Sequence, residues 1–166
     1  MLALAWLVFC MGQALADNLV ERGAYLTRAA GCMGCHTDRA GKGAPFAGGR
    51  ALKTPFGIFY SPNITAHKQT GIGAWSDGDF LAAVKQGIRP DGAHYFPVFP
   101  YTSYTLLRAE DVLAIKAYMF SLTPVARQNR AHDVGPPFSW RWSMGAWKQL
   151  YFDAGEFIAD DKQDAQ

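Results

Sequence analysis

The pentapeptide Cys32-Met33-Gly34-Cys35-His36 constrains what this chain can fold around more than any other segment. Two cysteines that are separated by two residues and followed at once by a histidine form the haem-attachment pattern Cys-x-x-Cys-His. The two thiols can add to the two vinyl groups along one edge of a haem. The adjacent imidazole then lies under the iron and can bind it through Nε2. We therefore predict one covalently attached haem c, held by Cys32 and Cys35, with His36 as an iron ligand.

Two other uses of the cysteine pair fit the sequence less well. A zinc site would need two further ligands, but no cysteine follows Cys35, and His67, His94 and His132 are scattered along the chain. A thioredoxin-like redox pair is typical of a strand–helix–strand unit, whereas glycine-rich sequence flanks this pair. Covalent haem attachment is therefore the favoured interpretation.

The N-terminal residues 1–16 have the pattern of a signal peptide. Leu2–Leu15 carry no charged side chain, and Ala14-Leu15-Ala16 matches the small-x-small pattern that precedes a cleavage site. A transmembrane anchor is the alternative, but the apolar stretch is shorter than the roughly 20 residues that span a bilayer. We expect export to the periplasm, where the protein would be associated with the outer face of the inner membrane.

The remaining sequence predicts one domain. A chain of 166 residues with 18% charged residues is long enough for one compact core. We place the haem domain at residues 17–152 and a C-terminal tail at residues 153–166. The net charge of +2 is too small to indicate a nucleic acid partner.

Three helices can be read from the sequence, and no convincing strand appears. The first covers residues 19–30, and the second begins at Ser76 as N-cap and ends at Gly87. The third covers residues 109–122, with acidic residues near its start and Pro124 beyond its end. Residues 37–72 read as a long loop that a ligand organises. We therefore predict an all-α fold of three to five helices, with long loops around one haem.

Several segments beyond the haem motif resemble the first haem domain of the cytochrome c subunits of bacterial membrane-bound alcohol, gluconate and aldehyde dehydrogenases. The resemblance covers about residues 19–152. It implies the cytochrome c fold of class I, in which the N-terminal helix and the last haem helix cross closely at Gly23 and Tyr118. The segments that carry it are Gly23–Leu26, Pro45–Gly49, Thr54–Gly57, Asn63–Thr65, Gly71–Asp77 and Pro97–Tyr101.

The resemblance also implies a function. The chain would be an electron-transfer protein and not itself an enzyme, taking electrons from a dehydrogenase subunit. Quinone, a terminal oxidase or another cytochrome would be the acceptor. Family members usually carry three haem motifs, whereas this sequence has one. We therefore predict a mono-haem cytochrome. The alternative is a truncated first domain of a multi-haem subunit, so direct quinone reduction is not carried over.

The sixth iron ligand departs from the family pattern. Many relatives place a methionine in a Pro-x-Met-Pro-Tyr segment, where this chain has Phe99. Met144 is the favoured replacement, because relatives with phenylalanine at this position often carry a methionine there. His94, Met119 and the absence of a strong ligand are the alternatives. A vacant distal site would make the protein a haem-based small-ligand binder or sensor. Peroxidase-like chemistry is disfavoured, since no distal acid–base group is placed for it.

Residues 136–152 are rich in aromatic side chains. Such a segment can pack over the haem, dock a partner, or make peripheral contact with a membrane. Three further residues are candidates, by residue type alone, for contacts with the haem propionates or edge: Arg50, Asn63 and Trp75.

Overall fold

The computed structural model describes residues 18–158. The predicted signal peptide at residues 1–16 and the end of the predicted tail, residues 159–166, lie outside the described residues. Residues 18–29 form a helix, and Gly31 separates it from the short helix α2 (Cys32–His36). Gly31 has a φ of +70°, a conformation that glycine adopts without strain. This turn redirects the chain so that the haem motif begins a new helix.

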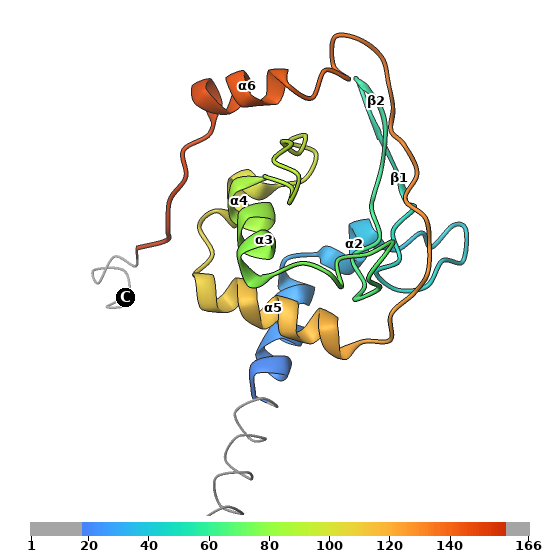
Figure 1. The fold of residues 1–166 in the computed structure, drawn as a ribbon, viewed down its shortest axis with the longest axis vertical. Helices are drawn as coiled ribbons and strands as arrows, with labels where there is room; N and C mark the ends of the chain where they lie inside the picture. The colour runs from blue at the N-terminus through green and yellow to red at the C-terminus, as the bar shows by residue number, and fades with distance from the viewer. Residues whose placement is uncertain (1–17, 159–166) are drawn as a thin grey trace, which may run out of the picture.

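The helix at residues 18–29 crosses α5 (Ala109–Ser121) near its middle (Figure 1). A Cβ atom added to Gly23 would lie only 1.9 Å from the carbonyl oxygen of Ala114 and 2.9 Å from Cβ of Tyr118. The absent side chain therefore lets the two backbones approach. This confirms the predicted close crossing at Gly23 and Tyr118, and α5 itself confirms the helix predicted at residues 109–122.

The second predicted helix is also present. It consists of α3 (Asp77–Leu81), which continues into the π-helical segment η1 (Ala82–Gln86). Ser76 and Asp79 form a reciprocal capping box at its start, and Gly87 ends it with a φ of +61°. The short helix α4 (Tyr101–Tyr104) packs against η1, where the Tyr101 ring fills the space beside Gly87.

The prediction of an all-α fold with three to five helices is wrong. The described residues contain a three-stranded antiparallel sheet in the order β1 (Ala51–Thr54), β2 (Gly57–Tyr60) and β3 (Asp133–Val134). They also contain more helical segments than predicted. Besides the helix at residues 18–29 there are six, namely α2, α3, η1, α4, α5 and α6, and of these α2, α4 and α6 were not predicted as helices. The strands have at most four residues, too few for sequence alternation to show them.

The sheet stands beside the helices, and the chain after α5 runs along it before reaching α6 (Ser143–Tyr151), at the end remote from the helix at residues 18–29 (Figure 1). Asn63 holds this returning segment, residues 122–142, in place. Its Nδ2 donates to the carbonyl oxygen of Val125 at 2.7 Å, and its backbone N–H donates to Oδ1 of Asn129 at 2.7 Å.

The apolar core lies between α3 and α5. Its most buried members are Phe46, Ile72, Phe80, Val112, Ile115 and Met119. The predicted tail begins with residues that contact the helical part, since the N–H of Phe157 donates to the carbonyl oxygen of Leu106 at 3.0 Å. Within residues 18–158, no helix is both long enough and apolar enough to cross a membrane.

Candidate functional site

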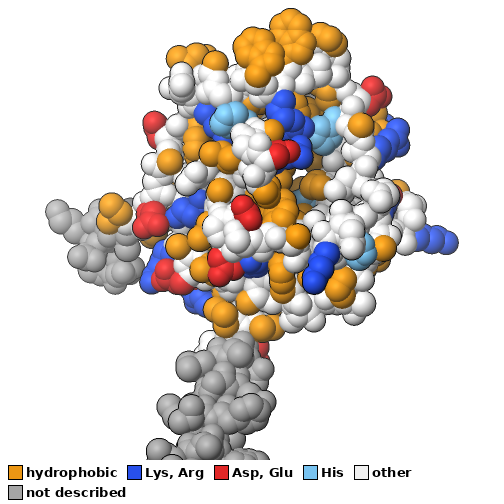
Figure 2. Space-filling model, viewed as in Figure 1, with side chains coloured by type: hydrophobic (Ala, Val, Ile, Leu, Met, Phe, Trp, Pro, Cys, Tyr) orange, Lys and Arg blue, Asp and Glu red, His pale blue; other side chains and the backbone are white. Residues whose placement is uncertain are grey.

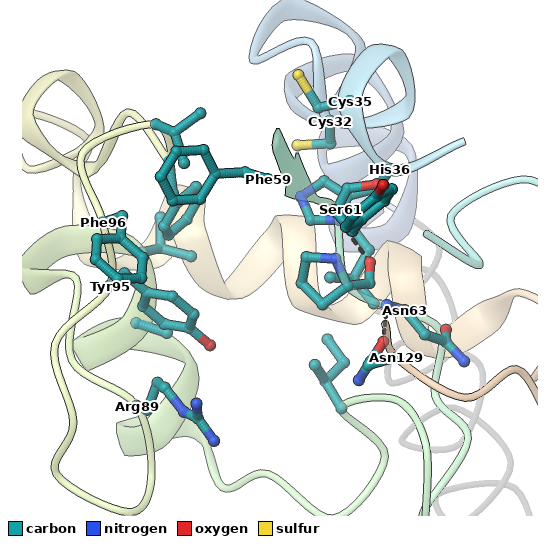
Figure 3. Close-up of a pocket in the computed structure, with 18 of the residues that line it drawn as sticks. Cys32, Cys35, His36, Phe59, Ser61, Asn63, Arg89, Tyr95, Phe96 and Asn129 are labelled. Atoms are coloured by element: carbon teal, nitrogen blue, oxygen red, sulfur yellow. Dashed lines mark hydrogen bonds between the residues drawn. The ribbon is translucent and has the colours of Figure 1, made fainter. Parts of the chain in front are cut away.

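The two predicted haem-attachment cysteines lie on α2, close to one another and on the same side (Figure 3). Both are free thiols; Cys32 is half-buried and Cys35 is exposed. Burial raises the pKa of the Cys32 thiol to about 11, so this group is protonated at neutral pH. The helix thus presents two reduced sulfur atoms at neighbouring positions.

His36 ends α2, and its ring is held by the loop that follows β2. Its Nδ1 lies 2.8 Å from the carbonyl oxygen of Pro62. A carbonyl oxygen only accepts hydrogen bonds, so this contact assigns the proton of the neutral ring to Nδ1 and leaves the Nε2 lone pair free. Burial lowers the pKa of His36, which favours the neutral form. A neutral imidazole with a free Nε2 is the form that binds a metal.

Cys32, Cys35 and His36 line one end of a cavity of about 1070 Å³. Its walls come from α2, β2, α3, α5 and the loops at residues 89–100 and 129–132, and most of the side chains are apolar. Large apolar cavities with a few polar groups are typical cofactor sites. The two thiols at its edge and the imidazole beside them fit a covalently attached haem. Phe59, Tyr95 and Phe96 lie across the cavity from His36 (Figure 3).

The alternatives for a sixth ligand are distributed unevenly around this cavity. Phe99 lines it and packs edge-on against Tyr95, with ring centroids 5.5 Å apart. Met119 also lines it from α5, but it is a buried member of the core. Met144 is half-buried on α6, and neither it nor His94 is among the described residues that line the cavity. The structure therefore does not bring Met144 together with His36, and its role as a ligand stays a prediction.

The three residues suggested for propionate or edge contacts are placed differently. Trp75 and Asn63 line the cavity. The Nδ2 group of Asn63 is used in hydrogen bonds to Thr70 and to the returning segment, so Asn63 serves the fold. The guanidinium of Arg50 donates to the carbonyl oxygen of Gly34, and Arg50 is not among the described cavity-lining residues.

Several polar side chains of the cavity wall could not be identified from the sequence, among them Arg89, Tyr95 and Arg141. The turn Arg89-Pro90-Asp91-Gly92 is recognisable as a turn, but nothing in its sequence indicates a cavity. Arg141 approaches it from a segment about fifty positions further along the chain. No spacing in the sequence relates the two, so only the structure brings them together.

The aromatic segment before and within α6 lies largely on the surface. Exposed apolar side chains project at this end of the molecule (Figure 2). Trp140 and Trp142 stack with ring centroids 6.0 Å apart, and Trp142 is 74% exposed. The other exposed members are Phe138, Leu150 and Tyr151.

Comparison with known proteins gives consistent matches. A family model described as Cytochrome c matches residues 20–123, more than half of the chain. The gluconate 2-dehydrogenase cytochrome c subunit of Pantoea cypripedii is 43% identical over 136 residues, which are 81% of this chain and 30% of that protein. The alcohol dehydrogenase (quinone) cytochrome c subunit of Gluconobacter oxydans is 42% identical over 81% of this chain and 28% of that protein.

A diheme cytochrome c-type protein of Cereibacter sphaeroides is 39% identical over 78% of this chain and 45% of that protein. The chain therefore spans less than half the length of each of these relatives. The matches agree with the free Cys-x-x-Cys-His motif at the edge of a large apolar cavity. By this similarity and by the residues that carry it, the chain belongs to the cytochrome c family.

Proposed function

We propose that this chain is a c-type cytochrome with one haem, which transfers electrons from a dehydrogenase partner to the respiratory chain. The observation that carries the proposal is the arrangement of Cys32, Cys35 and His36 at one end of an apolar cavity. Membership of the cytochrome c family supports electron transfer as the role. The names of the relatives, which are subunits of gluconate and alcohol dehydrogenases, support a dehydrogenase as the partner.

The residues of the site have three roles: attachment of the haem, binding of its iron, and exclusion of water. Haem, when bound, supplies reversible transfer of one electron. Cys32 and Cys35 anchor it through their sulfur atoms, and His36 offers Nε2 to the iron. The carbonyl oxygen of Pro62 fixes the ring orientation of His36 and increases its basicity as a ligand. Phe59 and Phe96 exclude water from the opposite wall.

Electrons enter and leave near α2 in this proposal. Cys35 lines the cavity and is also exposed, so the cavity reaches the molecular surface beside it. A partner that docks over this surface approaches the attached haem edge. Oxidation of the organic substrate takes place on the dehydrogenase, and this chain contributes no catalytic residue. A quinone, a terminal oxidase or another cytochrome receives the electron.

The proposal extends to the location of the protein. Covalent haem attachment occurs outside the cytoplasm, and the sequence pattern at residues 1–16 is that of an export signal. We place the protein in the periplasm, at the outer face of the inner membrane. The exposed side chains of Trp142, Leu150 and Tyr151 support peripheral contact with the lipid interface, where aromatic residues are enriched.

One observation favours a second function, the binding of a small gaseous ligand to the haem. Phe99 lines the cavity and stands at the position where, by the family resemblance, many relatives carry a methionine, whereas Met144 is outside the described lining. With no iron-binding side chain opposite His36, the distal position would be open. The protein would then respond to carbon monoxide or nitric oxide, and electron transfer would be slower because the iron changes its coordination.

An absorption spectrum of the reduced holoprotein, with and without carbon monoxide, separates these two functions. The electron carrier predicts a low-spin spectrum that carbon monoxide does not change. A high-spin ferrous spectrum that shifts with carbon monoxide contradicts it and supports the ligand binder. Electron acceptance is tested by mixing the oxidised cytochrome with gluconate or alcohol dehydrogenase catalytic subunits and their substrates, and following the reduced α-band.

A further inference from the structure

The cavity has a strongly cationic wall. Its lining includes three guanidinium groups, those of Arg89, Arg130 and Arg141, together with His132. Among the described residues that line the cavity, only Asp91 carries a carboxylate. Asp91 pairs with Arg89 at 2.8 Å. Within the described part of the chain, no carboxylate forms an ion pair with Arg130 or Arg141, so this wall has an excess of positive charge.

Neutral contacts hold the two unpaired guanidinium groups in place. Nη1 of Arg141 donates to the carbonyl oxygen of His94 at 2.8 Å, and its guanidinium lies 4.4 Å from the centre of the Phe96 ring. The guanidinium of Arg130 lies 3.9 Å from the centre of the Tyr60 ring. These contacts orient the groups, and within residues 18–158 they leave most of the donors without a partner, since a guanidinium has five N–H groups.

The charges of Arg89 and Arg141 influence the same titratable groups in the cavity wall. Burial, and to a smaller extent the positive charge of Arg89, lowers the pKa of Arg141. Burial is also the main cause that lowers the pKa of His132, and the charges of Arg141 and Arg89 lower it further. Like charges gathered in a partly apolar wall cost free energy unless an anion lies between them. The arrangement is therefore typical of an anion-binding site.

Tyr95 adds a neutral donor to this wall. Its ring projects into the cavity, and its hydroxyl points toward the region of Arg89 (Figure 3). Burial raises the pKa of Tyr95 to about 12, so the hydroxyl keeps its proton at physiological pH. Within residues 18–158 this hydroxyl has no hydrogen-bond partner, so it is available to an occupant of the cavity.

Arg89 lies at the end of the cavity remote from the cysteines, since its side chain and the sulfur atoms of Cys32 and Cys35 are at opposite ends of the view in Figure 3. A haem carries its two vinyl groups along one edge and its two propionates along the opposite edge. Attachment of the vinyl edge to Cys32 and Cys35 would therefore direct the propionates toward Arg89.

We propose that Arg89 and Arg141, with the Tyr95 hydroxyl, bind the haem propionates and keep them ionised, and that the positive charge of the two guanidinium groups raises the reduction potential of the haem. This inference rests on the proposed haem binding and assigns positioning residues that the family similarity alone does not identify. Each guanidinium offsets the negative charge of a propionate. Reduction adds one electron to the site, so nearby positive charge stabilises the reduced form.

The alternative is that Arg141 serves only the fold, by tying the segment before α6 to the loop at His94. The two roles predict different measurements. A structural role lowers the melting temperature of Arg141→Gln and leaves the reduction potential unchanged. A propionate-binding role lowers the potential and makes it depend on pH, because a propionate without its guanidinium partner takes up a proton in a higher pH range.

The test uses the haem-loaded, purified protein and measures the midpoint potential by spectroelectrochemistry from pH 5 to pH 9. The variants are Arg89→Gln and Arg141→Gln, with Arg141→Lys to restore the charge. Arg108→Gln is the matched control, because Arg108 is an exposed residue at the start of α5 that pairs with Glu110 outside the cavity lining. All are made in a His132→Asn background, since His132 also titrates at this wall. Asp91, Arg130 and Tyr95 are unchanged throughout.

We expect each glutamine variant to shift the oxidised-to-reduced equilibrium about tenfold toward the oxidised form, which is about 59 mV for one electron. We also expect a new pH dependence below neutral pH, near-complete recovery in Arg141→Lys, and no shift in Arg108→Gln. Potentials of Arg89→Gln and Arg141→Gln equal to that of the control would overturn the inference. If Arg141→Gln does not fold, Arg89→Gln decides the question alone. A wild-type chain without covalent haem would instead refute the proposed function.

Discussion

Gly23 lies where the helix at residues 18–29 crosses α5, and Gly23→Ala tests how closely the two backbones pack. The added methyl group would lie 1.9 Å from the carbonyl oxygen of Ala114, whereas an ordinary contact is about 3.5 Å. Relief requires the two helices to move apart, since the clashing atom belongs to the backbone. Overpacking of this kind costs about 3 kcal/mol, and the higher helix propensity of alanine returns about 1 kcal/mol. The expected net loss in the free energy of unfolding is about 2 kcal/mol.

This loss corresponds to a melting temperature lower by about 4–8 °C for a domain of this size. The assay is thermal unfolding of the haem-loaded protein, followed by circular dichroism at 222 nm. Gly78→Ala is the matched control, because Gly78 is also helical and its added Cβ would meet only Ser76 Oγ at 3.7 Å. The control should melt no lower than the wild type. A Gly23→Ala protein as stable as the control would refute the close crossing.

Two further predictions concern the helix cap and the sixth ligand. Asp79→Asn removes a carboxylate that accepts from the Ser76 backbone N–H and hydroxyl, contacts that lower its pKa. The wild type should therefore be more stable than this variant above about pH 4, and the advantage should vanish as the pH falls through the lowered pKa of Asp79; equal stability of the two proteins at pH 7 would argue against the cap. Met144→Ala should abolish a far-red methionine-to-iron band if Met144 binds the iron, whereas Met119→Ala should lower the melting temperature without changing the spectrum. An unchanged band in Met144→Ala would remove Met144 as a ligand.

Local signals explain which parts of the fold could be predicted. Ser76 and Gly87 mark the ends of the second helix through capping chemistry that involves only neighbouring residues. The acidic start of α5 is likewise local. The same is true of the Cys-x-x-Cys-His motif, because attachment and ligation use adjacent residues. These features need no knowledge of the rest of the chain.

The sheet and the cationic wall could not be predicted, for a common physical reason. The β1–β2 hairpin turns through Pro55 and Phe56 into Gly57, which has a φ of +127°, but β3 joins it from more than seventy residues away. Arg89 and Arg141 likewise line one cavity, because the chain after α5 brings Arg141 back to it. Contacts between distant parts of a chain leave no periodic pattern in either part. Met144 is suggested by the family resemblance, and the structure places it outside the described lining of the cavity.

The mass of the intact, denatured protein tests the central claim most directly. The protein should be produced in a bacterial periplasm with the c-type haem attachment machinery, together with a Cys32→Ala, Cys35→Ala double variant. We predict that the wild-type mass exceeds that of the processed polypeptide by one haem, and that the double variant has the mass of the polypeptide alone. A wild-type chain without bound haem after denaturation, or a double variant that retains it, would contradict the account.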